Sequence, residues 1–108
     1  MLAWVLANKA ELSQHQLIAT GTTGQLIAKE SGLQVQLVES GPYGGDIQIG
    51  AEMVENKINA LIFFWDPLEP QPHDPDVKAL LRVSVLKNIP TASNRATADL
   101  LIHSQFFN

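Results

Sequence analysis

The stretch Ser40-Gly41-Pro42-Tyr43-Gly44-Gly45-Asp46 separates two regular patterns and decides how the chain folds around it. The apolar run Val35–Val38 precedes it and is typical of a strand. After it, a helical pattern of apolar or small residues follows at Ile47, Gly50, Ala51, Val54 and Ile58. The stretch is therefore predicted to be a turn from a strand into a helix. Its three glycines allow the backbone to approach a ligand closely.

Asp46 stands where the predicted helix opens. The first turn of a helix has free N–H groups and a partial positive charge, which together suit an anion. One interpretation makes Asp46 the N-cap of the helix, a common role for aspartate. The other makes it a functional carboxylate beside a bound anion. The residues of this stretch alone leave both interpretations open.

A similar unit lies earlier in the chain. Gln16–Ala19 reads as a short strand, Thr20–Gly24 as a glycine-containing turn, and Gln25–Ser31 as a helix that stops at Gly32. Hydroxyls and amides at a helix start suit a phosphate, but an ordinary capped turn has the same composition. The glycine spacing matches neither the P-loop nor the dinucleotide-binding fingerprint.

The remaining pattern alternates strands and helices. A first helix is predicted from residue 2 to about residue 9. The later elements are a buried strand over Ala60–Trp65, a loop over Leu68–Asp74, a helix from Asp74, a weak strand over Ile89–Ala92 and a helix from Asn94.

This alternation predicts an α/β fold, a three-layer αβα arrangement with a parallel sheet, formed by residues 1–108 as a single domain. In such sheets ligands bind beyond the carboxyl ends of the strands. The predicted turns should therefore gather along one edge.

Composition narrows the class of protein. The chain has 108 residues, is 45% hydrophobic and carries a net charge of −4, so no basic surface for nucleic acid is expected. It has no cysteine, which excludes disulfides and thiolate zinc sites and fits a cytoplasmic protein. No apolar run approaches a membrane span, and the apolar start at Met1 lacks the basic residues of a signal peptide.

The segment His73-Asp74-Pro75-Asp76 admits three interpretations. A metal site would want more nitrogen ligands or a clustered set of acids. A helix start explains the aspartates but gives His73 no role. In an acid–base site, His73 would hydrogen-bond a substrate oxygen while a carboxylate orients its ring. Asp66 ends the predicted buried strand, either satisfying loop amides or positioning a substrate.

Taken together, these turns resemble those of the methylglyoxal synthase family. The resemblance rests on segments in family order that cover most of the chain: Thr20–Gly24, Ser40–Asp46, Phe63–Pro67, Pro72–Arg82, and Asn94 with Ala96–Asp99. It implies a carbon–oxygen lyase that converts dihydroxyacetone phosphate to methylglyoxal and inorganic phosphate through an enediolate phosphate. The resemblance implies no metal and no organic cofactor.

The resemblance also implies residue roles. Asp46 matches the base that takes a proton from the carbon carrying the free hydroxyl. His73 matches the residue that contacts the developing oxyanion or relays its proton, and Asp76 and Asp66 match supporting acids. The positions that match those holding substrate and phosphate are Thr20, Gly21, Thr22, Thr23, Ser40 and Gly41, with His73 also touching substrate. A homohexamer and inhibition by phosphate are implied as well.

The chain departs from the family pattern at both ends. The family begins with a central strand carrying a histidine, an aspartate and a lysine, which would precede Met1, and its last strand and helix would follow Asn108. We therefore expect a domain that lacks the family's first strand and is incomplete at both ends. Two alternatives follow, a non-catalytic phosphate- or effector-binding regulatory module of the same fold, and an inactive fragment.

Overall fold

The computed structural model describes residues 1–40, 43–64, 68 and 74–106, with the side chains of residues 74–76 left out of the description. Six helices and four strands alternate over most of this length. In chain order they are α1 (Leu2–Ala7), α2 (Lys9–Leu12), β1 (Leu17–Thr20), α3 (Gly21–Ser31), β2 (Val35–Val38), α4 (Gly45–Val54), β3 (Leu61–Ile62), α5 (Asp74–Leu86), β4 (Thr91–Ala92) and α6 (Arg95–Ile102).

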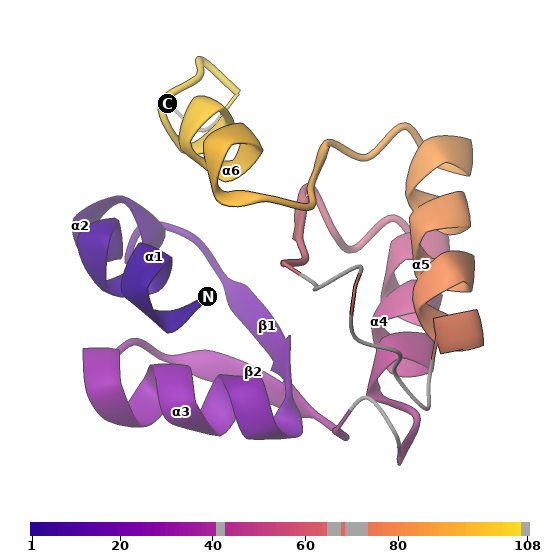
Figure 1. Ribbon diagram of the computed structural model, residues 1–108, viewed down its shortest axis with the longest axis horizontal. Helices are drawn as coiled ribbons and strands as arrows, with labels where there is room; N and C mark the ends of the chain where they lie inside the picture. The colour runs from indigo at the N-terminus through magenta and orange to yellow at the C-terminus, as the bar shows by residue number, and fades with distance from the viewer. Residues whose placement is uncertain (41–42, 65–67, 69–73, 107–108) are drawn as a thin grey trace. The chain divides into compact units, whose positions relative to one another are not determined.

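The chain divides into two compact units, Met1–Gln48 and Ile49–Asn108. In the first, β1 and β2 pair in parallel with Leu17 opposite Val35 and Thr20 opposite Val38. Helix α3 packs along both strands and also contacts α1 (Figure 1). The apolar core of this unit consists of Trp4, Val5, Leu12 and Ile27.

Helix α3 buries one face and ends as its sequence predicts. Gly24, Ile27 and Ser31 are buried, at the i, i+3 and i+7 spacing of a single helical face. Gly32 then adopts a left-handed conformation with φ of 75°, and its N–H donates to the Ala28 carbonyl. A glycine that takes this conformation without a Cβ penalty is a common helix stop, so this prediction is confirmed.

The predicted turn over Thr20–Gly24 is not a loop. Helix α3 begins at Gly21, directly after β1, with Thr20 in an extended conformation as its N-cap. The glycine is needed for close approach, because a Cβ on Gly21 would lie 3.2 Å from both the Val38 carbonyl oxygen and the Ser40 Oγ. The glycine-rich segment is therefore the first turn of the helix, pressed against the end of β2.

The second unit contains a separate two-stranded parallel sheet, in which Leu61 pairs with Thr91 and Ile62 with Ala92. Helix α6 packs against β4. The buried apolar residues of this unit are Ile49, Met53, Leu61, Val77, Leu80, Ala92, Ala98 and Ile102. Helix α4 starts in the first unit and continues into this one. The prediction of a single domain, incomplete at both ends, stays a prediction.

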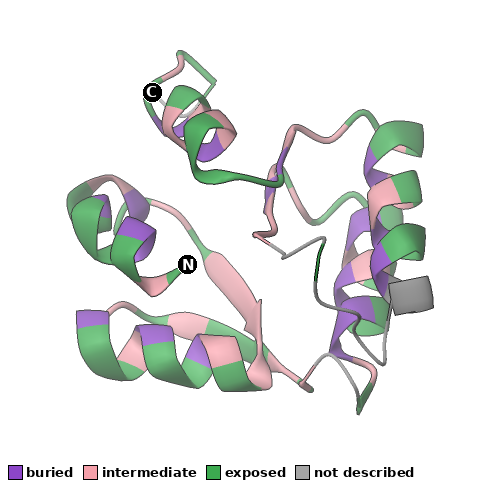
Figure 2. Cartoon of the chain, viewed as in Figure 1, coloured by how far each residue is buried: buried purple, intermediate pink, exposed green. Residues whose placement is uncertain are grey.

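The helix expected after residue 46 is present as α4, but the residues of the helical pattern do not form its buried face. Ile47 and Val54 are 61% and 50% exposed, and Ile58 lies beyond the end of the helix. The buried residues of the helix are Gly45, Asp46, Ile49 and Met53, of which the last three keep helical spacing. Figure 2 shows buried and exposed positions alternating along α4. The apolar pattern therefore predicted the helix but not its buried face, because that face includes the carboxylate of Asp46.

The later elements follow their predictions more closely. Helix α5 begins at Asp74 as expected. The spacing of Val77, Leu80, Leu81 and Val85 predicts a buried face, and Val77 and Leu80 are buried, whereas Val85 is 82% exposed. Asn94 caps α6, because its side-chain oxygen accepts the Thr97 N–H at 2.9 Å. The two strands of this unit are only two residues long, shorter than the runs from which they were predicted. Among the described residues, no helix is long and apolar enough to cross a bilayer.

Candidate functional site

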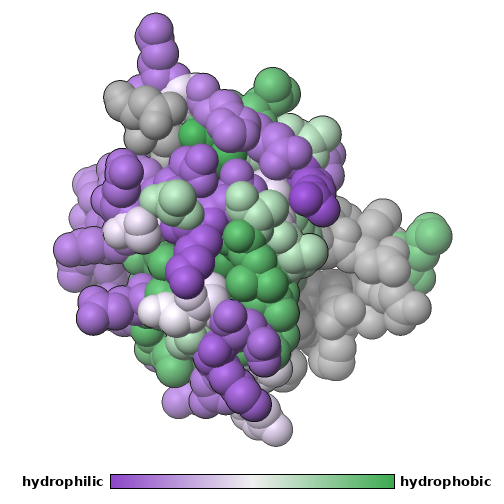
Figure 3. Space-filling model, turned by 90° about the vertical axis from the view of Figure 1, so that its left-hand side faces the viewer, coloured by the Kyte–Doolittle hydropathy of each residue, from purple (hydrophilic) through white to green (hydrophobic). Residues whose placement is uncertain are grey.

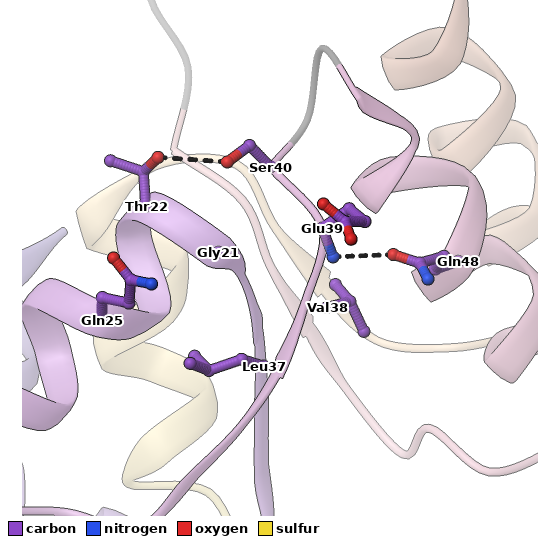
Figure 4. Close-up of a pocket in the computed structure, with 8 residues that line it drawn as sticks. All are labelled: Gly21, Thr22, Gln25, Leu37, Val38, Glu39, Ser40 and Gln48. Carbon is purple, nitrogen blue, oxygen red and sulfur yellow. Dashed lines mark hydrogen bonds between the residues drawn. The ribbon is translucent and has the colours of Figure 1, made fainter.

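A pocket of about 400 Å³ lies at the carboxyl ends of β1 and β2, within the first unit (Figure 4). The described residues that line it come from the start of α3, the end of β2 and the first turns of α4. They are Gly21, Thr22, Gln25, Leu37, Val38, Glu39, Ser40 and Gln48. The position agrees with the rule that α/β proteins bind ligands beyond the carboxyl ends of parallel strands.

Two hydroxyls meet at this pocket. Thr22 Oγ1 and Ser40 Oγ lie 3.2 Å apart and share a hydrogen bond (Figure 4). The strand register brings them together. Thr20 pairs with Val38, Thr22 lies two residues after Thr20, and Ser40 lies two residues after Val38. Hydroxyls of this kind can donate to an anionic oxygen.

The peptide groups of Glu39 join the two helix starts. The Glu39 carbonyl accepts the Gly21 N–H at 3.3 Å, which connects it to α3. The Glu39 N–H donates to Gln48 Oε1 at 2.7 Å, which connects it to α4 (Figure 4). Residue 39 follows β2 directly, so its main chain is held from both sides at the point where the pocket opens.

The turn into α4 is closed by the next residue. The Ser40 carbonyl accepts the N–H of Tyr43 at 2.9 Å and of Gly45 at 3.0 Å. A side chain at residue 45 has no room, because a Cβ there would collide with the Glu39 carbonyl oxygen. Glycine at this position therefore lets the helix start directly beside the end of β2.

Asp46 follows in the first turn of α4 and is only 3% exposed. A buried carboxylate costs desolvation energy, and the positive end of the helix dipole offsets part of that cost. Asp46 is not among the described residues that line the pocket. It lies one residue after Gly45, whose N–H donates to the Ser40 carbonyl, so its backbone is connected to the residue that carries one hydroxyl of the pair.

Among the residues that the structure describes, the hydrogen-bond donors of the pocket are neutral and its one charge is negative. Among its described lining residues, Glu39 alone carries a charge, and that charge is negative. The Thr20 side chain makes no cap hydrogen bond to α3. The Gly21 N–H already donates to the Glu39 carbonyl, whereas the N–H groups that follow in the first turn of a helix ordinarily lack a main-chain acceptor and can serve an anion. The pocket therefore combines an anion-binding helix start with one opposing carboxylate.

The structure places some of the predicted site residues at one pocket, whereas others do not line it or lie outside the described residues. Gly21, Thr22 and Ser40 line one pocket, whereas Thr20 and Thr23 are not among its described lining residues. Gly41, Asp66 and His73 lie outside the described residues. Asp76 belongs to α5, but its side chain is not described. The catalytic and binding roles of all these residues stay predictions.

Sequence reasoning missed five lining residues, namely Gln25, Leu37, Val38, Glu39 and Gln48. Gln48 is the most informative of these, since it makes a defined hydrogen bond to the main chain at the end of β2. The available signal was a polar side chain two positions after Asp46, in the first half of a helix whose neighbouring residues there are small or apolar. That signal is weak, because exposed helical glutamines are common.

The geometry defines an α/β protein with a small polar pocket at the carboxyl ends of a parallel strand pair. A family model described as "MGS-like domain" matches residues 2–93. The chain is 57% identical to the methylglyoxal synthase of Yersinia pestis (strain Pestoides F), over 100% of this chain and 70% of that protein. The same figures hold for the methylglyoxal synthase of Yersinia pseudotuberculosis serotype O:1b (strain IP 31758).

A solved structure agrees with the sequence relatives. The crystal structure of methylglyoxal synthase from Elizabethkingia anophelis NUHP1 superposes with a TM-score of 0.92 at 49% identity, covering 98% of this chain and 70% of that chain. The chain belongs to the methylglyoxal synthase family. The α/β fold and the family resemblance predicted from the sequence are both confirmed.

Proposed function

We propose that this chain acts as a methylglyoxal synthase, a carbon–oxygen lyase that converts dihydroxyacetone phosphate to methylglyoxal and inorganic phosphate. The observation that carries the proposal is the buried Asp46 carboxylate, which follows the turn that begins at Ser40, whose hydroxyl bonds the Thr22 hydroxyl at the pocket. The relatives from Yersinia and Elizabethkingia, which bear the name methylglyoxal synthase, support the choice of reaction.

In the proposed reaction Asp46 takes a proton from the carbon that bears the free hydroxyl, and the electron pair of that C–H bond forms an enediolate. The enediolate then expels phosphate as the C–O bond breaks and the leaving oxygen keeps the electron pair. The remaining enol becomes methylglyoxal by proton transfer. His73 would contact the developing oxyanion, and losing one such donor typically costs about 3 kcal/mol of transition-state stabilisation.

Neutral hydrogen-bond donors would bind the phosphate. Gly21, Thr22 and Ser40 line the pocket, and we assign the two hydroxyls to the phosphate or its neighbouring oxygens. Gly21 is assigned to the same site for the close approach that it allows, because its N–H donates to the Glu39 carbonyl. Thr20, Thr23 and Gly41 are proposed to complete this set, and Asp66 and Asp76 to support the acid–base groups. Helix starts and hydroxyls supply partial positive charge, which suits a dianion without a bound metal.

Assembly and location are part of the proposal. The exposed large apolar side chains in the first unit include Leu6, Leu26, Leu37 and Tyr43. Figure 3 shows apolar atoms on the surface among hydrophilic ones on the face displayed. Exposed apolar area of this kind favours association between copies, in line with the proposed homohexamer. Inhibition by phosphate is proposed on the family resemblance, and a cytoplasmic location on the lack of cysteine.

The test is turnover of dihydroxyacetone phosphate, followed as release of both methylglyoxal and phosphate. Asp46→Asn should lower kcat roughly 10²–10⁴-fold, the usual contribution of a general base. Glu30→Gln makes the same acid-to-amide change at an exposed position of α3 outside the pocket and should leave kcat unchanged. An Asp46→Asn variant that turns over as fast as the parent would remove the assigned base.

Binding measurements separate the alternatives. Calorimetry that detects phosphate binding to the parent without any turnover would favour a regulatory module. A chain with neither binding nor a cooperative melt would be an inactive fragment. Turnover lost in Asp46→Asn with phosphate binding retained would support the lyase.

A further inference from the structure

We propose that Gln48 is a positioning residue for Asp46, acting through its hydrogen bond to the main chain at the end of β2. This inference rests on the proposed function, because it concerns where the assigned base stands during the reaction. Gln48 itself is not proposed to touch the reacting atoms.

The hydrogen bond of Gln48 extends the strand ladder. Gln48 Oε1 accepts the Glu39 N–H at 2.7 Å, a short distance for an N–H donor and a neutral oxygen (Figure 4). Glu39 comes directly after the last residue of β2 and has no β1 residue opposite it in the strand register. The side chain of Gln48 thus continues the hydrogen bonding of the strand at the point where the ladder ends.

A short path leads from this bond to the base. Gln48 and Asp46 are two residues apart in one helix, so fixing one to β2 restricts the position of the other. The Gln48 N–H also donates to the Gly44 carbonyl at 3.0 Å, which closes the turn that contains Asp46. The carboxylate therefore lies on a helical turn with two hydrogen bonds to the residues that follow β2. The Gly45 N–H donates to the Ser40 carbonyl, and the Gln48 side chain accepts the Glu39 N–H.

The main chain of Glu39 also holds the binding side of the pocket. The Glu39 carbonyl accepts the Gly21 N–H, and the next residue brings its hydroxyl to Thr22. Residue 39 thereby sets the distance between the hydroxyl pair and the first turn of α4. A base that shifts by about 1 Å against its substrate can lose about 10²-fold in rate, so a bond with this placement bears on kcat.

The experiment compares two substitutions at this position. Gln48→Met keeps the length of the side chain but removes the acceptor, and it should lower kcat roughly tenfold or more with a change in KM below about threefold. Gln48→Glu keeps an acceptor oxygen at the same reach, so kcat should stay within about threefold of the parent. Its added negative charge should instead raise KM, and this rise should shrink at high salt.

A matched control and a structural readout complete the design. Gln36→Met makes the same change at an exposed position of β2 that does not line the pocket, and it should match the parent. Amide hydrogen exchange at Glu39 should become roughly tenfold faster in Gln48→Met and stay close to the parent rate in Gln48→Glu. A thermal melt of each variant checks that it folds.

The outcomes are distinct. A parent that turns over while Gln48→Met keeps the parent kcat overturns the inference and leaves the proposed function standing. Equal loss of kcat in Gln48→Met and Gln48→Glu also overturns it, because the acceptor would then not be the property that matters. A parent that releases no methylglyoxal overturns the proposed function, and the positioning role with it.

Discussion

Replacing Gly45 with alanine should destabilise this protein strongly, because the added methyl group has no room. An ideal Cβ at residue 45 would collide with the Glu39 carbonyl oxygen and would lie 2.8 Å from the Glu39 carbonyl carbon. It would also lie 3.0 Å from the Ser40 carbonyl carbon. These neighbours are main-chain atoms, so none of them can rotate away as the end of a flexible side chain could.

The expected loss of stability follows from the contacts that the added methyl group would disturb. Separating α4 from the end of β2 strains or breaks the Gly45 N–H bond to Ser40 and the Gln48 bond to Glu39. Each hydrogen bond is worth about 1 kcal/mol net, and overpacking adds about 1–3 kcal/mol. The expected loss is therefore about 3–5 kcal/mol, a large part of the total stability of a small domain.

The assay is urea unfolding followed by circular dichroism, with a thermal melt beside it. Gly45→Ala should lower the free energy of unfolding by about 3–5 kcal/mol and the Tm by roughly 12–30 °C. A variant within about 0.5 kcal/mol of the parent would refute the reasoning, since that is the range of an ordinary surface substitution.

Two other glycines provide controls. Gly50 lies inside the same helix, and its Cβ would meet only Leu80 Cδ1, at 3.9 Å. Gly50→Ala should therefore stabilise the protein by about 0.5–1 kcal/mol through helix propensity. Gly32 has open space within 4 Å of its Cβ but a φ of 75°, so Gly32→Ala should cost about 1–2 kcal/mol from backbone conformation alone.

Three further substitutions test the pocket and one helix cap. Ser40→Ala removes one hydroxyl of the pair, and it should raise the phosphate Kd in calorimetry roughly tenfold, because a hydrogen bond to a charged acceptor is worth about 1.5–3 kcal/mol. Glu39→Gln removes the negative charge at the pocket and should lower that Kd by up to about fivefold, with the gain fading as salt rises. An unchanged Kd would mean that phosphate binds elsewhere. Asn94→Ala removes the cap bond of α6 and should cost about 1 kcal/mol in urea unfolding, whereas Asn94→Asp should restore most of it.

Sequence reasoning succeeded where the chemistry is local. The left-handed glycine after α3, the asparagine cap of α6 and the start of α5 at Asp74 each depend on a few neighbouring residues. The alternation of strands and helices was readable for the same reason, since each element has its own periodicity.

The rest depended on contacts that the sequence does not display. The inward face of α4 begins with Asp46, and a polar residue on a buried face contradicts the hydrophobic pattern used for prediction. The bond between Gln48 and Glu39 joins residues nine positions apart across a turn. Its existence requires the path of that turn, which only the folded chain defines.

The two parallel sheets bear on how this protein associates with other molecules. Each contains two strands, so within the described residues every strand has a sheet neighbour on one side only. Unpaired main-chain donors and acceptors on a strand edge can template an extended segment of another molecule. Handling at high concentration therefore carries a risk of strand-to-strand aggregation, and a peptide that pairs with one of these borders would act as a stabiliser.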